Sequence, residues 1–147
     1  MNAIVIRDMR PEDVLEAAAI ERSSFSMPWS ENSFYGEVYG RYSITRVAVS
    51  NDRIAGYVVG RIILDEGHLL DMAVEYAFRR RGIARRLMED IIGGLRLNRC
   101  KAFYLEVRDS NCAARRLYES LGFTIIGTRK TYYKNPVEDA CIMMLEL

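Results

Sequence analysis

The segment best suited to bind an anion runs from Arg79 to Arg86, where five of eight residues are arginine. Gly82 and Ala84 stand among these arginines, and their small size would let a phosphate approach the backbone. The segment lies between a predicted strand and a predicted helix, and a helix N-terminus offers unpaired N–H groups and a positive dipole potential. The pattern therefore favours a phosphate-bearing ligand, while a solvated basic helix start or a nucleic-acid patch would use the same charges.

Glu106 is a candidate for acid–base chemistry. Apolar residues alternate with it along a predicted strand, so Glu106 points to the opposite face together with Tyr104. A carboxylate near the end of a central strand could act as a general base. The alternative is a strand-end ion pair with Arg108 or with another arginine.

Two further features have an ordinary structural interpretation beside a functional one. Tyr118 lies on a helical apolar stripe with Leu117 and Leu121, and periodicity alone predicts a core aromatic residue. The segment from Tyr132 to Asp139, between the last two predicted strands, combines two tyrosines with two carboxylates. Such a loop could shape a binding cleft or attract a cationic ligand, and it fits an ordinary turn equally well.

The composition limits the class of protein. The 147 residues predict one domain, residues 1–147, and the net charge of +1 argues against a surface built for nucleic acid or an anionic membrane. The sequence has no run of 18 apolar residues, so no transmembrane helix is predicted. Charged residues follow the first few apolar ones too soon for a signal peptide. The three cysteines show no close pairing, so we expect them to be reduced and to fill gaps in the core. Reduced thiols are typical of proteins in the cytoplasm. Because His68 is the only histidine and is expected to be structural, no metal site is predicted.

Periodicity and turn signals predict an α/β (α+β) protein with a mixed sheet and helices on both faces. The third helix should follow the arginine segment, since apolar residues recur there at every fourth position. Ser30 and Asn111 are suited to cap the second and fourth helices. The expected strands are 3–8, 44–50, 54–64, 67–75, 101–107, 123–132 and 138–146, and the expected helices are 11–24, a short one after Ser30, one extending to about 98, and 112–121.

Several motifs together resemble a known family. Arg79-x-x-Gly82-x-Ala84 after a strand resembles the acetyl-CoA pyrophosphate loop of the GNAT acetyltransferases. Leu105-Glu106-Val107-Arg108 and a helix motif starting at Asn111 follow at the right distances. With Pro28-Trp29-Ser30 near the front, the set resembles the RimI subfamily of ribosomal-protein alanine N-acetyltransferases over nearly the whole chain. This resemblance implies the GNAT fold, with a mostly antiparallel central sheet of about seven strands.

The resemblance also implies roles for individual residues. Glu106 matches the general base, and Tyr118 matches the general acid, which overrides its interpretation as core alone. Trp29 and Tyr133 would border the acceptor cleft. The residues implied to hold acetyl-CoA are Met72, Ala73, Val74, Arg79, Arg80, Arg81, Gly82, Ile83, Ala84, Arg85 and Asn111. Two departures are Ala84, where many relatives have glycine, and Asp71, where asparagine is expected.

The implied activity is transfer of acetyl from acetyl-CoA to a protein N-terminal α-amine, most plausibly the N-terminal alanine of the eighteenth small-subunit ribosomal protein. That protein would be the partner, with no metal, no membrane and no direct nucleic-acid contact. Other readings are a broader archaeal-type N-terminal acetyltransferase or a small-amine acetyltransferase on the same fold. A catalytically silent cofactor sensor or a basic RNA-binding module is the non-enzymatic alternative.

Overall fold

The computed structural model describes residues 3–147, which form a seven-stranded sheet in the order β1-β2-β3-β4-β5-β7-β6. All neighbouring strands are antiparallel except β4 and β5, which are parallel. The predicted mixed, mostly antiparallel sheet is therefore confirmed. The strands are β1 (Val5–Arg7), β2 (Ser43–Ser50), β3 (Arg53–Ile63), β4 (Glu66–Val74), β5 (Ala102–Arg108), β6 (Thr124–Tyr133) and β7 (Glu138–Glu146).

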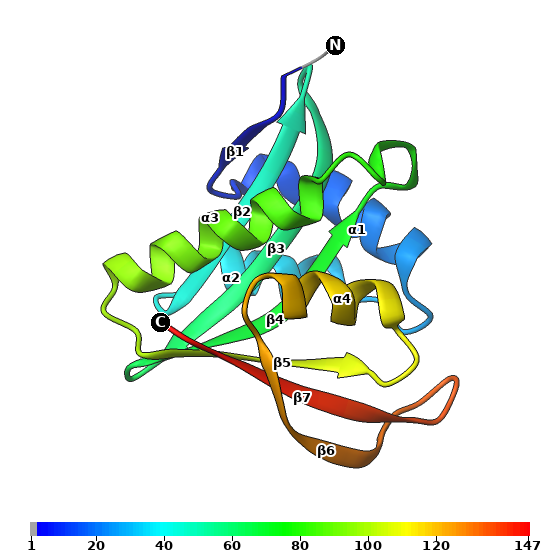
Figure 1. Ribbon diagram of the computed structural model, residues 1–147. Coiled ribbons are helices and arrows are strands. Elements are labelled where there is room, and N and C mark those ends of the chain that lie inside the picture. Colours follow the sequence, from blue (N-terminus) through cyan, green and yellow to red (C-terminus); the bar gives the residue numbers. More distant parts are fainter. Residues whose placement is uncertain (1–2) are drawn as a thin grey trace.

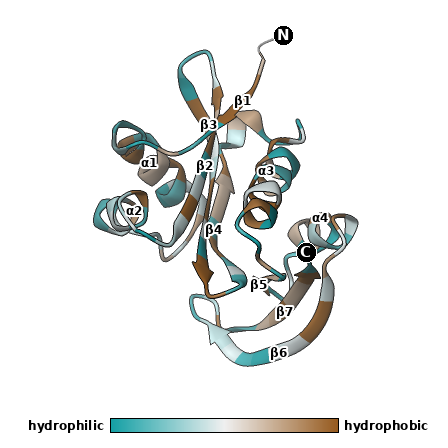
Figure 2. Ribbon diagram, turned by 90° about the vertical axis from the view of Figure 1, so that its left-hand side faces the viewer, coloured by the Kyte–Doolittle hydropathy of each residue, from teal (hydrophilic) through white to brown (hydrophobic). Residues whose placement is uncertain are grey.

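Helices cover both faces of this sheet, as predicted (Figure 2). One face carries α1 and α2, and the other carries α3 and α4. The side chain of Ser30 caps α2 by accepting from the Ser33 N–H, and Asn111 caps α4 by accepting from the Ala114 N–H. The bounds are α1 (Val14–Ser24), α2 (Glu31–Val38), α3 (Ile83–Leu97) and α4 (Cys112–Ser120), with short 3₁₀ turns η1 (Pro11–Asp13) and η2 (Tyr76–Phe78).

Each face of the sheet has its own hydrophobic core. Val14, Phe34 and Tyr57 are fully buried between the sheet and α1 and α2. The core under α3 contains the apolar residues that were predicted at every fourth position of this helix. Each is at most 2% exposed: Ile83, Leu87, Ile91 and Leu95. Burial of an aliphatic side chain of this size contributes roughly 1.5–3 kcal/mol. These residues therefore fix the start of α3 against the sheet.

The sheet opens between β4 and β5. These strands pair only from Glu66 opposite Ala102 to His68 opposite Tyr104. Just beyond, β4 carries a bulge at Leu70, because the pairing partners of β3 step directly from Leu69 to Asp71. The two strands then diverge, as Figure 1 shows. The backbone of β4 after the bulge consequently has no β5 neighbour and can pair with a ligand.

Two expectations about composition can be compared with the structure. Cys100 and Cys141 are buried, but Cys112 is exposed, so the prediction that all three cysteines fill the core was wrong for Cys112. Cys112 is the first residue of α4, where its side chain stays in solvent. Across residues 3–147, the structure contains no helix with the length and hydropathy of a membrane span.

Candidate active site

A cavity of about 580 Å³ lies where the end of β4, the start of α3 and α4 come together. We call it the cofactor-side cavity. It brings together all of the predicted acetyl-CoA residues except Arg81. Its lining comprises Ser24, Phe25, Met72, Ala73, Val74, Phe78, Arg79, Arg80, Gly82, Ile83, Ala84, Arg85, Asn111, Ala113, Ala114 and Leu117.

The turn before α3 has the backbone that an anion site requires. Arg80 and Gly82 both have left-handed backbone conformations, with φ of 64° and 73°. No side chain caps the first N–H groups of α3, which are left without partners inside the helix. A Cβ at position 82 would meet no atom within 4 Å, so the space beside this glycine is open. The turn therefore presents free N–H groups at the positive end of the α3 dipole.

The five arginines of this segment have different surroundings. Arg79 donates from Nε to the Val74 carbonyl oxygen at 3.0 Å, and Arg85 donates to the Ser120 hydroxyl. These two line the cavity with Arg80. Arg81 lies over the Phe78 ring at 5.6 Å, and Arg86 donates to the Ile4 carbonyl oxygen, so neither lines the cavity. The structure thus gathers three of the five positive charges around the turn.

A second cavity, of about 610 Å³, also borders the β4–β5 junction. We call it the acceptor-side cavity. Its β4 wall ends at Leu70 and the cofactor-side cavity begins at Met72, so the two cavities border β4 within three residues of each other, at the bulge. Its lining comprises Glu66, His68, Leu69, Leu70, Tyr104, Leu105, Glu106, Tyr132, Tyr133 and Ile142.

Glu106 lies on the predicted face of β5, opposite the buried Leu105 and Val107, and it forms an ion pair with Arg129 at 2.9 Å. The expected alternative of a pairing with an arginine is therefore observed, although the partner is Arg129 and not Arg108. The Glu106 side chain is 29% exposed and that of Arg129 is 52% exposed. Solvent screens such an exposed pair, so it contributes little to stability and Glu106 can exchange Arg129 for another cation at little cost.

Two tyrosines stand beside Glu106. Tyr132 lies within hydrogen-bonding reach of the Glu106 carboxylate, and burial followed by this contact raises the pKa of Tyr132. Burial and then the Glu106 charge raise the pKa of Tyr133 to about 12. Tyr133 thus lines the acceptor-side cavity as a neutral phenol at physiological pH, and its place at the border of an acceptor cleft stays a prediction.

Tyr118 is 6% exposed and packs against Phe123 in the core under α3, with ring centroids 5.8 Å apart. Burial, followed by the proximity of Tyr133 and Asp71, raises the pKa of its hydroxyl. Tyr118 lines neither cavity, whereas Ala114 and Leu117 of the same helix line the cofactor-side cavity. Tyr118 is therefore a core residue with a protonated hydroxyl, and its role as a general acid stays a prediction.

Tyr118→Phe separates these two roles. The change removes only the hydroxyl and keeps the ring in the core, so the melting temperature should change little. If the hydroxyl protonates a leaving group, turnover should fall roughly 10²-fold or more, as for other general acids. Steady-state kinetics beside thermal unfolding provide the measurement, with the exposed Tyr39→Phe as control. Unaltered turnover in the Tyr118 variant would leave this residue with packing alone.

Trp29 lies outside both cavities. Its ring packs against Phe34 at 5.4 Å, and its backbone N–H donates to Glu21 Oε2 at 3.0 Å. The structure therefore places Trp29 between α1 and α2. Its place in the acceptor cleft stays a prediction.

The sequence did not single out three residues of the acceptor-side cavity: Glu66, His68 and Tyr104. The His68 ring stacks on Tyr104, with centroids 5.5 Å apart and an interplanar angle of 22°. These two residues are opposite each other in the short parallel register of β4 and β5. The alternation of β5 already placed Tyr104 beside Glu106, but the β4 partner depended on a register that no local pattern contains.

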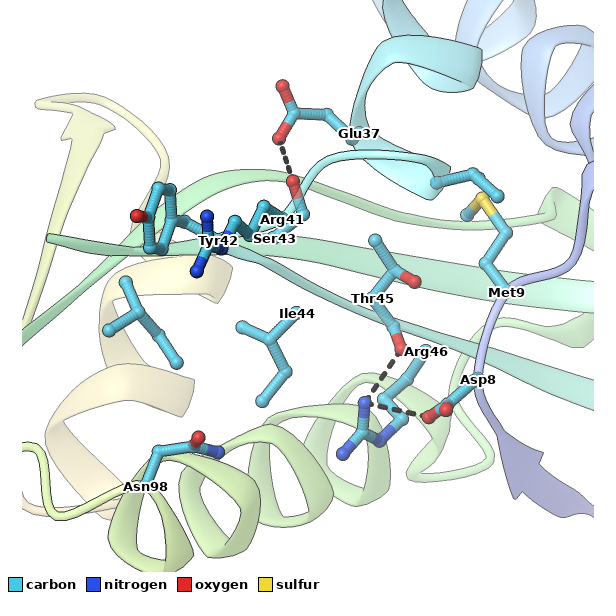
Figure 3. A pocket seen from close by; sticks show the side chains of 12 residues that line it. Asp8, Met9, Glu37, Arg41, Tyr42, Ser43, Ile44, Thr45, Arg46 and Asn98 are labelled. Carbon is cyan, nitrogen blue, oxygen red and sulfur yellow. Dashed lines mark hydrogen bonds and ion pairs between the residues drawn. The ribbon is translucent and has the colours of Figure 1, made fainter.

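A third cavity, of about 400 Å³, is lined by polar residues that already satisfy one another (Figure 3). Arg46 bonds to Asp8 at 2.9 Å and to the Thr45 carbonyl oxygen at 2.8 Å, and Ser43 donates to Glu37 at 2.6 Å. None of the predicted site residues lines it. Within the described part of the chain, no cluster of histidine, cysteine and acidic side chains suits a metal ion.

Two features together are typical of one class of proteins, the acetyltransferases: a sheet that opens after a β4 bulge, and a turn with free N–H groups at the start of the next helix. The chain belongs to the acetyltransferase (GNAT) family, which it matches over residues 12–123.

Individual proteins of known name or structure resemble this chain over nearly its full length. The chain is 39% identical to the [ribosomal protein bS18]-alanine N-acetyltransferase of Salmonella typhimurium, over 100% of this chain and 99% of that protein. The crystal structure of the ribosomal-protein alanine N-acetyltransferase of Escherichia coli matches with a TM-score of 0.91 at 34% identity, over 98% of this chain and 94% of that one. A structure of the NatC complex bound to Gag peptide and CoA matches with a TM-score of 0.87 at 25% identity, covering 98% of each chain.

Proposed function

We propose that this protein, as one domain over residues 1–147, transfers acetyl from acetyl-CoA to the N-terminal alanine of a bS18-type ribosomal protein in the cytoplasm. The observation that carries the proposal is the position of two cavities along β4, one before and one after its bulge. One contains the anion-binding turn, and the other contains a carboxylate among aromatic rings. The names of the bacterial relatives support the choice of acceptor.

The residues of the cofactor-side cavity fit acetyl-CoA, which supplies an activated thioester. The free N–H groups after Gly82 would bind its pyrophosphate, with Arg79, Arg80 and Arg85 adding positive charge. The backbone of β4 from Met72 to Val74 pairs with β3 on one side and has no β5 neighbour on the other, where it would bond the amide groups of the pantetheine arm as an added strand does. Asn111, whose side chain already caps α4, lines the same cavity.

The acceptor amine must lose a proton before it can attack. A free α-amine has a pKa near 8, so most of it is protonated at pH 7. In the proposed reaction Glu106 takes this proton, directly or through a water, and backbone N–H groups of β4 polarise the thioester carbonyl. The amine nitrogen forms the new bond to the acetyl carbon as the carbon–sulfur bond breaks. Tyr118 gives its proton to the departing thiolate, and no covalent enzyme intermediate is needed.

The reaction should select an α-amine over a lysine side chain. The lysine amine has a pKa about two units higher and sits on a flexible four-carbon stem, so less of it is neutral and well placed. One peptide beginning with alanine and containing an internal lysine should be tested with a free and with a blocked N-terminus. Mass spectrometry should find acetyl only on the free N-terminus. Comparable lysine acetylation on the blocked peptide would contradict the proposal and favour a lysine or small-amine acetyltransferase.

A panel of peptides that differ only in the first residue then tests the acceptor. A preference for alanine in kcat/KM supports the bS18-type substrate. Equal rates across several first residues would instead indicate a broader N-terminal acetyltransferase.

A further inference from the structure

Two carboxyl groups, one buried and one partly buried, lie in hydrogen-bonding contact on the α1 face of the sheet. They belong to Glu21 of α1, which is 2% exposed, and to Asp71 of β4. Asp71 Oδ2 is buried and receives no hydrogen bond from any donor in the described chain. None of the ion pairs within residues 3–147 includes either carboxyl. Two adjacent carboxylates without a cation would repel strongly, so this pair must hold a proton.

The hydrogen bonds indicate where that proton lies. Glu21 already accepts from two donors, the Tyr57 hydroxyl and the Trp29 backbone N–H, whereas Asp71 Oδ2 has no donor. Burial, followed by the bond to Glu21 and its charge, raises the pKa of Asp71 well above its usual range. A proton on Asp71 then donates to Glu21 and gives the unpartnered oxygen a bond.

A protonated aspartic acid has nearly the shape of asparagine and the same zero charge, with one donor side and one acceptor side. This accounts for Asp71 at the position where the family resemblance leads one to expect asparagine. The residue follows the bulge at Leu70 and precedes Met72, the first β4 residue of the cofactor-side cavity. Through Glu21, its bond reaches α1, Tyr57 of β3 and the Trp29 loop.

We propose that the proton shared by Glu21 and Asp71 is a positioning element for acetyl transfer, holding β4 just after its bulge against α1. The role rests on the proposed function. Asp71 lines neither cavity, so it acts through the backbone of Met72 and is a positioning residue. A displacement of about 1 Å in a reacting group can cost roughly 10²-fold in rate. The titratable groups that bear on Asp71 are Glu21 of α1, Tyr57 of β3 and Tyr118 of α4.

Asp71→Asn tests the shared proton without any activity assay. The native pKa of Asp71 lies above its unfolded value of about 3.9. Above about pH 4 the unfolded state therefore loses this proton while the folded state keeps it. Wild-type stability should therefore fall relative to the asparagine variant, and the difference should widen from pH 5 to pH 8. Denaturant unfolding of both proteins at each pH measures this difference in the free energy of unfolding. The other titrating groups are the same in both proteins, so their contributions cancel in the difference. A pH-independent difference would overturn the shared proton.

Asp71→Leu, which keeps similar bulk but cannot bond to Glu21, tests the positioning role at pH 7. With an alanine-starting peptide, the asparagine variant should keep kcat within about threefold of wild type, and the leucine variant should lose roughly tenfold or more while acetyl-CoA still raises its melting temperature. Equal kcat in the two variants would overturn the role.

If the leucine variant does not fold, the pH dependence of kcat in the wild type and in Asp71→Asn tests the positioning role instead. The ratio of wild-type to Asp71→Asn kcat should fall as the pH rises from 7 to 9.5, because only the wild type can lose the proton; a constant ratio would overturn the role. A wild type that acetylates no peptide overturns the positioning role together with the proposed function, whereas the stability comparison still decides the shared proton.

Discussion

Glu106→Gln is expected to lower turnover roughly 10²–10⁴-fold at pH 7, the range for loss of a general base. The amide keeps the size of the side chain but cannot accept a proton from the acceptor. Acetyl-CoA affinity should stay close to that of the wild type, because Glu106 lines the acceptor-side cavity and not the cofactor-side cavity. Steady-state kinetics with an alanine-starting peptide, beside the melting-temperature shift with acetyl-CoA, measure the two effects separately.

The pH dependence sharpens this prediction. As the pH rises past about 8, more of the acceptor amine is already neutral, so the defect of the glutamine variant should shrink. Glu146→Gln is the matched control, since Glu146 is exposed at the end of β7 and lines neither cavity. A Glu106 variant with wild-type turnover at pH 7 would remove this carboxylate from the mechanism.

The ion pair with Arg129 gives a related expectation of smaller size. Because Arg129 is exposed and solvent screens the pair, its removal by Arg129→Ala should leave the stability of the protein nearly unchanged. The variant frees the Glu106 carboxylate for the acceptor amine. Turnover should therefore be kept or increased, and a loss as large as that of Glu106→Gln would mean that Arg129 itself acts in the reaction.

Local patterns predicted those parts of the site that local geometry builds. The stripe from Ile83 to Leu95 fixed the direction of α3, and the alternation of β5 correctly placed Glu106 on the face opposite the core. Helix capping by Asn111 likewise depends on neighbouring residues only. The turn before α3 is of the same kind, because Gly82 is followed at once by the helix that it starts.

Contacts between distant segments could not be predicted in this way. Arg129 reaches Glu106 only through the pairing of β6 and β7, and the bulge at Leu70 appears only when β3 and β4 are aligned. Gly94 lies inside α3, where glycine lowers helix stability, yet a Cβ there would lie 2.7 Å from Ile44 Cδ1. This glycine permits the close approach of α3 to β2. Such effects depend on packing across the sheet, which a single sequence does not contain.

Gly82→Asp is expected to remove most acetyl-CoA binding. The substitution places a negative charge beside the proposed pyrophosphate position and a side chain on a residue with φ of 73°. Wild-type protein at a ligand concentration 100 times its Kd should gain about 2.7 kcal/mol, which is roughly 5–10 °C in melting temperature for a chain of this length. A 100-fold weaker variant at the same concentration should gain only about 0.4 kcal/mol, and its shift should nearly vanish.

Gly82→Asn separates charge from bulk. Asparagine has almost the same shape as aspartate, tolerates the left-handed conformation better than most residues and is neutral. No atom lies within 4 Å of the added Cβ, but the φ of 73° strains both variants, so the shift with ligand is measured from each variant's own melting temperature without ligand. The asparagine variant should keep an intermediate share of the shift with acetyl-CoA. Equal shifts for the wild type and Gly82→Asp would contradict the placement of the pyrophosphate at this turn, because a carboxylate cannot stand beside it without a loss of affinity.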